Sequence, residues 1–581
     1  MSAVHEYFHS AWVCDFEFHQ PKGEIPSPIC MSAVELRTGE ERNVWFPGAD
    51  VARCPLPLGR RHLFLAYYAS AELGCFLALG WAFPRSVIDL YFEFRCSTNG
   101  LRVPAGSGLL GACTYHGINA MPASVKSVNQ SLAIRGGPYS DGERAALQKY
   151  CLEDVRATAE LFRRMRIPFG EALHRGRYCS ALAIMEHNGI PLDAPLLERL
   201  RAHWGGIQAG IIRRVDPLGE VYQDGSFRVD RFASFLRRRS IAWPLLPSGQ
   251  LQLDDQAFRD GARSHPADIG PIRELRQTLG KMRLNRLPVG SDGRNRCLLS
   301  PFRSRTGRNQ PSNSKFIFGP STWLRSLIRP DPGRALAYID WSQQEFAIAG
   351  ALSGDAAMCS AYTSGDPYLT FAKQAGAVPP DATKQTHPHE RGQFKVCALA
   401  VQYGMGDRSL SVQLGGDRLD ALHLLRLHRE AYPTYWAWSQ GAVESAALTG
   451  QLSTVFGWQL RVGVDPNPRS LANFPCQANG AEILRLACCL IVERGVRLLA
   501  PIHDAVLIEA DAEDIDEAVR TTQTAMQDAG RIVLDGFDLR TDADVVRYPE
   551  RYSDGRGREF FRAICGLIPG GSADVNPHHT G

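Results

Sequence analysis

Two apolar segments that are far apart in the sequence each run directly into an aspartate. Residues 335–339 lead to Asp340, and residues 498–502 lead to His503 and Asp504, which have the pattern of a tight hairpin. Short apolar runs of this kind favour buried strands, and a carboxylate at a strand end can face a cleft. We expect the two strands to be neighbours in one sheet, so that the carboxylates of Asp340 and Asp504 meet.

Length and composition restrict the class of protein. A chain of 581 residues is too long for one hydrophobic core, so two to four domains are expected. The net charge of +4 neither indicates nor excludes a nucleic-acid partner, because a local basic surface can be balanced elsewhere. The 15 cysteines include no CxxC pair, which indicates reduced, buried thiols in a cytoplasmic protein. No leader and no bilayer-spanning apolar run is recognisable, so neither a secreted nor a membrane protein is expected.

Local patterns divide the chain into segments of different character. Residues 1–170 alternate strand-like runs at 12–18, 29–36 and 63–67 with helices, and a helix at about 140–165 closes this α/β segment. Residues 171–296 are Arg-rich and largely helical, and strands and helices mix again after residue 297. The last dozen residues have a composition typical of disorder.

A helical stripe lies between the two aspartates. Arg391, Lys395, Leu399 and Tyr403 recur every four residues, which places them along one face of a helix that Gly404 ends. Two cations at the start of this stripe can bind triphosphate oxygens, and the ring of Tyr403 can lie against a base. A surface helix with a basic first half is the alternative. Because cations near a helix N-terminus oppose the macrodipole, we expect an anion partner there.

The first predicted strand carries two acids on one face. Asp15 and Glu17 are two residues apart, so both point the same way and repel each other unless a cation lies between them. Tyr150 and Asp154 are four residues apart in a helical pattern and again share a face. A metal-bound carboxylate beside a phenol can orient the water that attacks a terminal phosphodiester.

The motifs around the first two aspartates resemble those of family A (polymerase I type) DNA polymerases. Asp340-Trp-Ser-Gln-Gln-Glu345 resembles motif A, Arg391-x3-Lys395-x7-Tyr403-Gly404 resembles motif B, and His503-Asp504 resembles motif C. These segments occur in the family's order, so a chance match is improbable.

Two further segments resemble the parts of these enzymes that contact DNA. Thr306-Gly-Arg308, with Asn313 downstream, resembles the segment that follows the duplex minor groove. Arg469-x3-Asn473-x3-Gln477 resembles the start of the helix that contacts primer–template, and we place Pro475 in the first turn of that helix.

The resemblance implies a role for each matching residue. Asp340 and Asp504 are the implied catalytic residues, and they would bind two Mg2+ ions, which Mn2+ can replace, with help from the carbonyl of Trp341. The implied dNTP-binding residues are Arg391, Lys395, Leu399, Tyr403 and Glu345, the last of which would exclude a ribose 2′-hydroxyl. The implied DNA-binding residues are Arg308, Asn313, Arg469, Asn473, Gln477 and His503. The partners are therefore primer–template DNA and dNTPs, and a monomer is expected.

This sequence departs from the usual motifs at four positions. Trp341 stands where Tyr is usual, Ala347 where Arg is usual, Leu399 where Phe is usual, and Ala505 where Glu is common. None of these changes removes a metal ligand or a phosphate-binding cation. Leu399 with the following Tyr-Gly-Met-Gly is similar to phage-encoded members, which implies replication of a phage genome in the host cytoplasm.

The acids of the first segment resemble the DnaQ-type 3′→5′ exonucleases. Asp15, Glu17, Tyr150 and Asp154 match the first and third motifs of that family, and Glu72 stands where the second motif has an Asp. The implied catalytic residues are Asp15, Glu17, Glu72, Tyr150 and Asp154, with Asp15, Glu17 and Asp154 as metal ligands. Tyr68 replaces the Asn of the second motif, and Asp89 is a further acid that we interpret as structural.

Both resemblances together imply a domain plan. An α/β exonuclease domain with an RNase H-like mixed sheet would occupy residues 1–170, followed by an α+β right-hand polymerase. The polymerase would consist of a linker and thumb (171–296), a palm in two parts (297–354 and 456–550), fingers (355–455) and a C-terminal tail (551–581). We expect no 5′-nuclease domain, so another protein would remove primers.

Three alternatives remain open on the sequence. A single-subunit RNA polymerase shares the palm chemistry, but Glu345 beside Tyr403 argues against it. A non-catalytic DNA-binding protein predicts the loss of carboxylates or cations that are all present. A repair polymerase with an inactive exonuclease depends on whether Glu72 works as a ligand.

Overall fold

The computed structural model describes residues 6–48, 51–119, 123–282, 284–319, 321–463 and 466–569, and they form two compact units. The first unit comprises Met1–Gly189, Leu298–Pro311 and Leu336–Val545, and the second comprises Ile190–Cys297, Ser312–Ala335 and Val546–Gly581. Nowhere in the described ranges does a helix combine the length and apolar composition that crossing a bilayer requires.

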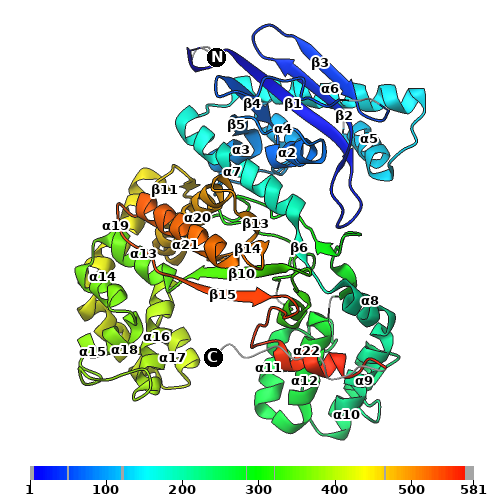
Figure 1. The fold of residues 1–581 in the computed structure, drawn as a ribbon. Coiled ribbons are helices and arrows are strands. Elements are labelled where there is room, and N and C mark those ends of the chain that lie inside the picture. The colour runs from blue at the N-terminus through cyan, green and yellow to red at the C-terminus, as the bar shows by residue number, and fades with distance from the viewer. Residues whose placement is uncertain are drawn as a thin grey trace. The chain divides into compact units, whose positions relative to one another are not determined.

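The first unit opens with a mixed five-stranded sheet in the order β3-β2-β1-β4-β5 (Figure 1). Its strands are β1 (Ser10–His19), β2 (Ser27–Glu35), β3 (Glu41–Trp45), β4 (His62–Ala66) and β5 (Ser86–Asp89). β1, β2 and β3 pair antiparallel, whereas β1, β4 and β5 pair parallel. The predicted α/β pattern of the first segment is confirmed.

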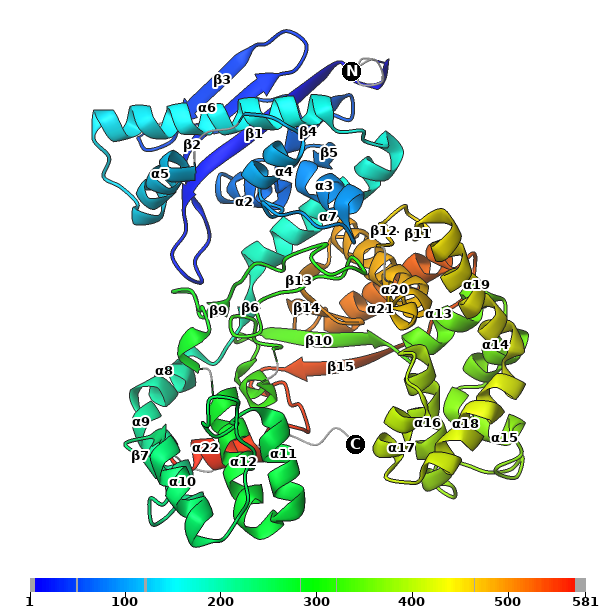
Figure 2. The ribbon, with the colours of Figure 1, turned by 180° about the vertical axis from the view of Figure 1, so that it is seen from behind.

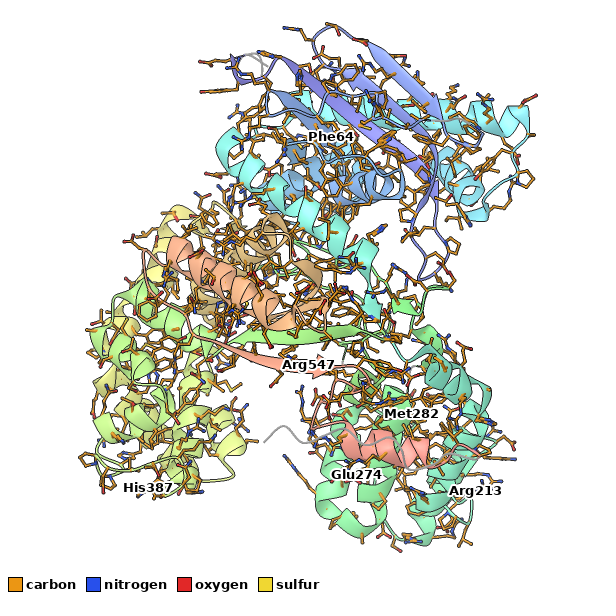
Figure 3. All side chains as sticks on the ribbon, viewed as in Figure 1. Phe64, Arg213, Glu274, Met282, His387 and Arg547 are labelled. Atoms are coloured by element: carbon orange, nitrogen blue, oxygen red, sulfur yellow. The ribbon has the colours of Figure 1, made fainter. Side chains whose placement is uncertain are left out.

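Helices cover this sheet because their apolar stripes need a partner. They are α2 (Ala69–Ala78), α3 (Leu90–Thr98), α4 (Leu109–Tyr115), α5 (Ala123–Arg135), α6 (Asp141–Arg164) and α7 (Phe169–Asn188). A capping box between Ser140 and Glu143 starts α6, and Leu147 and Cys151 of this helix pack against Ile29 and Cys30 of β2. Phe64 of β4, labelled in Figure 3, is buried and meets Phe76 of α2 edge to face.

A second sheet of four strands has the order β13-β14-β10-β15 (Figure 2). It consists of β10 (Arg334–Trp341), β13 (Arg497–Ile502), β14 (Ala505–Asp511) and β15 (Thr541–Arg547). β13 and β14 form an antiparallel hairpin in which Ile502 pairs with Ala505, and β14 lies beside β10. This confirms the predicted tight hairpin at His503 and Asp504. It also confirms that this hairpin lies next to the strand that carries Asp340.

Two long helices pack against each other beside this sheet, α20 (Pro468–Glu493) and α21 (Ile515–Val533). Our placement of Pro475 in the first turn of α20 is wrong, because the helix begins at Pro468. Asn467 caps it by accepting a hydrogen bond from the Arg469 backbone N–H at 3.0 Å, and Pro468 fills the first position, where no N–H is needed. Pro475 therefore lies inside the helix.

The segment between the two halves of this sheet is mostly helical. Its elements are α13 (Gln344–Ser353), α14 (Ala356–Thr363), α15 (Pro367–Gln374), α16 (Pro388–Gln402), α17 (Asp407–Leu414), α18 (Arg418–Ala431), α19 (Pro433–Thr449), β11 (Gln451–Ser453) and β12 (Gln459–Arg461). Its core contains His428 between the rings of Phe371 and Tyr432, and burial lowers the pKa of His428 to about 3. This histidine is thus a neutral core residue.

The second unit is built mainly from helices around an apolar cluster that includes Phe232, Phe258 and Ile269. Its elements are β6 (Ile190–Pro191), α8 (Ala194–Ala202), α9 (Trp204–Val215), β7 (Tyr222–Gln223), β8 (Ser226–Phe227), α10 (Val229–Arg238), α11 (Asp255–Ser264), α12 (Pro266–Lys281), η1 (Leu284–Arg286), β9 (Arg294–Asn295), η2 (Thr322–Leu327) and α22 (Arg558–Cys565). The helical character predicted for residues 171–296 is confirmed, whereas the predicted domain boundaries stay predictions. The predicted disorder of residues 570–581 lies outside the described residues.

Candidate active sites

The four-stranded sheet brings Asp340 and Asp504 together. Asp340 is the penultimate residue of β10, and the backbone N–H of the next residue, Trp341, donates to the backbone carbonyl of Asp504 at 3.2 Å. His503 turns the β13–β14 hairpin with a φ of 55°, a conformation that costs a non-glycine residue free energy. The two aspartates thus lie beside each other, one at the end of β10 and one in the turn before β14.

Burial and neighbouring charge act on both carboxyl groups. Burial is the main cause that raises the pKa of Asp340 to about 6, and the charge of Asp504 is the next. Burial also raises the pKa of Asp504, on which the charges of Glu345 and Arg308 act in opposite directions. A site that raises the pKa of two adjacent carboxyl groups disfavours their ionised forms unless a cation offsets the charge.

Two further acids of this site were missed by sequence reasoning. Asp542 and Asp544 lie on β15, the neighbour of β10, and their charges contribute to the raised pKa of Asp340. Asp542 accepts a hydrogen bond from the hydroxyl of Ser342. The signal was a spacing of two residues on a strand, the same spacing that identified Asp15 and Glu17.

Glu345 joins three of the predicted DNA- and dNTP-binding residues. Its Oε1 accepts hydrogen bonds from Gln477 Nε2 at 2.7 Å, Arg308 Nη2 at 3.2 Å and the hydroxyl of Tyr403 at 3.4 Å. These donors come from α20, from the loop before β10 and from the C-terminal end of α16. The structure therefore brings together four residues that the sequence spreads over more than a hundred positions.

The two predicted phosphate-binding cations lie on α16, as the helical spacing predicts. Arg391 pairs with Asp366 at 2.5 Å, so the anion partner expected near this helix N-terminus is present within the chain. Arg391 and Lys395 each lie 5.8 Å from the ring centroid of Tyr368. Both cations thus gather around one aromatic ring beside Asp366.

The C-terminal end of α16 contains the other residues of the predicted motif B, Leu399, Tyr403 and Gly404. Leu399 is half-buried, and Tyr403 is 46% exposed at the C-cap, where its ring is accessible to a ligand. Gly404 has a φ of +63°, and a Cβ atom there would lie 3.0 Å from the Cβ of Arg469. Glycine is thus required both by the backbone conformation and by the close approach of Arg469.

For the other predicted DNA-binding residues Asn473, His503 and Asn313, the positions are as follows. Asn473 is half-buried on α20, one turn before Gln477, and His503 is exposed in the hairpin. Asn313 is exposed and belongs to the second compact unit.

The N-terminal acids form a second site. Asp15 and Glu17 lie on β1, and Glu72 on α2 is buried beside them. Burial, followed by the charges of Asp15 and Glu17, raises the pKa of Glu72 well above its ordinary value. Within the described part of the chain, Glu72 Oε2 has no hydrogen-bond partner.

Tyr150 and Asp154 on α6 complete this second site. Burial is the main cause that raises the pKa of Tyr150, followed by the charge of Asp154 and then by those of Glu17 and Asp15. The hydroxyl of Tyr150 is hydrogen-bonded to Asp154. Asp15, Glu17, Glu72, Tyr150 and Asp154 are therefore close enough to influence one another, and the charge of Asp89 also contributes to the raised pKa of Glu72.

Asp89 has a structural role, as we interpreted it. Its carboxylate accepts backbone hydrogen bonds from Phe92 at 3.1 Å and from Ala69 at 2.7 Å, and so caps α3 and the start of α2. Tyr68, just before α2, has a φ of 78°.

Neither site is a complete cage for a metal ion. Among the residues that the structure describes, no group of three or more His, Cys, Asp and Glu side chains has the arrangement of a metal site. Any cation would need further oxygen ligands from the backbone, from water or from a substrate.

A solved structure shares the fold of most of this chain. This chain is similar to the structure described as "POL domain of Pol1 from M. smegmatis complex with DNA primer-template and dNTP", with a TM-score of 0.69 at 17% sequence identity. The similarity covers 94% of this chain and 97% of that one.

A family similarity is found in the segment that carries the motifs around Asp340 and Asp504. Residues 318–545 match the family model of DNA polymerase family A, a segment that contains Asp340, Glu345, Arg391, Lys395, Tyr403 and Asp504.

Three relatives show how far the similarity extends. The chain is 28% identical to the "DNA polymerase I, thermostable" of Thermus caldophilus over 221 residues, which are 36% of this chain and 26% of that protein. It is 22% identical to the DNA polymerase I of Aquifex aeolicus over 66% of this chain and 72% of that protein. It is 27% identical to the DNA polymerase of Mycobacterium phage D29 over 50% and 49% of the two chains. The matched part thus spans about a quarter of the length of the Thermus relative.

Proposed function

We propose that this chain is a DNA-directed DNA polymerase that extends a primer 3′ end with dNTPs along a template. The observation that carries the proposal is the meeting of Arg308, Tyr403 and Gln477 at Glu345, beside Asp504. This cluster combines donors for a duplex, an aromatic ring for a base and carboxylates for a cation. The match of residues 318–545 to the family model of DNA polymerase family A supports the proposal.

Asp340 and Asp504, with the carbonyl of Trp341, would hold two Mg2+ ions. The residues fit such ions, because both carboxyl groups have a raised pKa and oxygen donors are the ligands that Mg2+ prefers. Bound Mg2+ would stabilise the charge that develops on the attacking and leaving oxygens, and Mn2+ would substitute. Triphosphate oxygens would complete the coordination.

Arg391 and Lys395 would bind the triphosphate of the incoming dNTP. Arg391 would exchange its contact with Asp366 for a phosphate oxygen, since a planar guanidinium suits both partners. Leu399 and Tyr403 would lie against the nascent base pair, and Glu345 would exclude the 2′-hydroxyl of a ribonucleotide.

Arg308, Asn313, Arg469, Asn473, Gln477 and His503 would bind primer–template DNA. Arg308 and Gln477 would donate hydrogen bonds to acceptors in the minor groove. Every correct base pair presents similar acceptors there, so these contacts would report pairing geometry and not sequence.

We propose that the N-terminal domain is a 3′→5′ exonuclease with an RNase H-like fold that removes mismatched primer ends. The supporting observation is the buried Glu72, on whose pKa the charges of Asp15 and Glu17 act and whose Oε2 has no hydrogen-bond partner among the described residues. Asp15, Glu17 and Asp154 would hold the cation, and Tyr150 would orient the attacking water. Glu72 would replace the Asp of the family motif.

Two substitutions separate the two proposed activities. Asp504→Ala should lower primer extension by about a thousandfold or more, because it removes a ligand of the catalytic cation. The same variant should still shorten a mismatched primer in the absence of dNTPs. Asp15→Ala should show the reverse. A primer-extension gel with and without dNTPs measures both activities.

The same gel decides between the alternatives. Extension by the Asp504→Ala variant at a near wild-type rate would contradict the metal assignment, and extension with rNTPs as fast as with dNTPs would favour an RNA polymerase. Normal extension without any shortening of mismatched primers would show that the N-terminal site is inactive.

We propose further that the enzyme copies a phage genome in the host cytoplasm. The similarity to the polymerase of Mycobacterium phage D29 and the Leu399 variant of motif B support this. Recovery of the encoding sequence from phage particles would support the proposal, and its recovery only from a bacterial chromosome without prophage genes would contradict it.

A further inference from the structure

The loop that carries Arg308 has no regular structure of its own. Residues 302–308 form neither helix nor strand, and Phe302 at its start has a φ of 53°. Its last residue, Arg308, reaches Glu345 at 3.2 Å. Because an irregular backbone supplies few of its own hydrogen bonds, other elements must hold this loop in place.

Side chains of the N-terminal domain bind the carbonyl groups of this loop. Arg95 on α3 donates from Nε to Phe302 O at 3.2 Å and from Nη2 to Arg303 O at 2.9 Å. Asn99, the C-cap residue of α3, donates from Nδ2 to Arg305 O at 2.7 Å. Three of the loop's carbonyl groups are thus held by the end of one helix.

Two further side chains, one just before β12 and one on α20, donate hydrogen bonds to the same loop. Trp458 Nε1 donates to Arg305 O at 3.0 Å, and Arg485 Nη1 on α20 donates to Gly307 O at 2.6 Å. The carbonyl of Arg305 therefore accepts two hydrogen bonds, one from Asn99 and one from Trp458.

Packing makes these contacts rigid. The ring of Phe302 lies 4.5 Å from that of Phe92 on α3 and 4.9 Å from that of Trp458, and Arg485 lies 4.3 Å above it. Phe92, Phe302, Trp458 and Asn99 are all almost completely buried. Because the side chains of Asn99 and Trp458 are buried, their part-buried bonds to the Arg305 carbonyl are partly shielded from water.

The end of α3 is also fitted closely to β12. Asn99 Nδ2 donates to Gln459 O at 2.7 Å, and the Arg461 backbone N–H donates to Asn99 O at 2.9 Å. Gly100 follows with a φ of +90°, and a Cβ atom there would lie 2.1 Å from Arg461 O. Only glycine allows the two backbones to approach this closely.

We propose that Arg95 and Asn99 are positioning residues for primer–template binding, which act by holding the loop that presents Arg308. This inference rests on the proposed polymerase function. It gives the N-terminal domain a role in polymerisation that is separate from proofreading, because the contacts lie on α3 and not among the acids of the second site.

A double-mutant cycle between Asn99 and Arg308 tests the proposal. Asn99→Ala should weaken primer–template binding about tenfold, because the carbonyls of Arg305 and Gln459 each lose a donor, and Arg308→Ala should weaken it at least as much. The double variant should bind no more weakly than Arg308→Ala alone, because Asn99 acts through Arg308. Fluorescence anisotropy with a labelled primer–template measures the affinity of the 581-residue chain.

Additive effects of the two substitutions would overturn the proposal, since they would show that Asn99 acts independently of Arg308. Arg95 is only half-buried, so Arg95→Ala offers the same cycle if Asn99→Ala does not fold. Degradation of single-stranded DNA should be unchanged in both variants, and a parallel loss of that activity would point to damage of the whole domain instead.

Two glycine variants provide a matched pair. Gly100→Ala and Gly39→Ala both place alanine at a positive φ, at +90° and +74°, but only the Cβ at residue 100 meets another backbone. Gly100→Ala should weaken primer–template binding about tenfold and Gly39→Ala should leave it unchanged. Equal effects would overturn the proposal. If the wild-type protein does not extend a primer at all, the proposed function itself has failed.

Discussion

At the scale of single residues, the environment of each carboxylate decides what it can do. Glu345 accepts hydrogen bonds from three donors within the chain. Asp340 instead lies among other acids, and its pKa rises to about 6. A carboxyl group that lies among other acids, such as that of Asp340, favours binding either a proton or a metal ion.

Primer extension should therefore depend on pH and on Mg2+ together. Below about pH 6 Asp340 is protonated, so the rate of single-nucleotide incorporation should fall about tenfold for each further pH unit. Because Mg2+ competes with the proton for the carboxylate, a higher Mg2+ concentration should move this decline to lower pH. Rates of a single turnover, measured at two Mg2+ concentrations, check the prediction.

The same shift predicts the effect on stability. The pKa of Asp340 is raised in the folded state, from 3.8 to about 6, so its contribution to stability is fully present below about pH 4 and is lost as the pH rises through about 6. Mg2+ should accordingly raise the unfolding temperature more at about pH 7 than at about pH 5. A decline in rate that ignores Mg2+, together with an equal shift at both pH values, would contradict the role of Asp340.

At the scale of elements, helix ends place the residues of both sites. Asp89 caps α3 and binds the first residue of α2, the helix that carries Glu72. In the same way, the end of α16 at Tyr403 and Gly404 sets the position of the exposed ring. Hydrogen bonds and backbone conformations at helix ends thus fix the positions of residues in both sites.

Asp89→Ala should destabilise the protein by about 2–3 kcal/mol, because it leaves buried backbone N–H groups without an acceptor. It should also lower the exonuclease activity by shifting α2. Asp89→Asn should cost less, since the amide keeps an acceptor oxygen. Urea denaturation and degradation of single-stranded DNA measure the two effects.

Asp254 provides the control for this comparison. It caps α11 in the second unit and is exposed, and it accepts a hydrogen bond from the Ala257 backbone N–H at 2.8 Å. Asp254→Ala should cost only about 1 kcal/mol, because water can replace the lost acceptor. A loss at Asp89 no greater than that at Asp254 would refute the importance of burial.

At the scale of the whole molecule, the N-terminal sheet and most of the four-stranded sheet belong to one compact unit. Helix α7 contacts both β5 and β13. Arg175 on this helix is 2% exposed. It donates two hydrogen bonds of 2.7 Å to the carboxylate of Glu93 and a third of 3.1 Å to Phe456 O. A buried ion pair thus lies where the two sheets are joined through α7.

Arg175→Met should therefore destabilise this unit by about 3–5 kcal/mol, because Glu93 would be left as an uncompensated buried charge. Adding Glu93→Leu to this variant should recover part of the loss, because two apolar side chains need no partner. Chemical denaturation of both variants, with Arg163→Met on the surface of α6 as the control, measures the difference. A double variant that is less stable than Arg175→Met would contradict the expected coupling.

The sequence by itself determined the residues whose relation is local. The spacing of two at Asp15 and Glu17, the spacing of four at Arg391 and Lys395, and the hairpin at Asp504 all follow from strand, helix and turn geometry, so they are visible in a single segment. The start of α20 was misplaced, because two prolines compete for the same role and only the cap at Asn467 decides between them.

The tertiary structure alone decided which of these segments meet. The three donors on Glu345, the partner Asp366 of Arg391 and the acids of β15 beside Asp340 depend on sheet order and helix packing. The hold of Arg95 and Asn99 on the loop of Arg308 depends on them as well. Such contacts join residues that share no periodicity, because they arise from the burial of many apolar side chains at once and not from the conformation of any one segment.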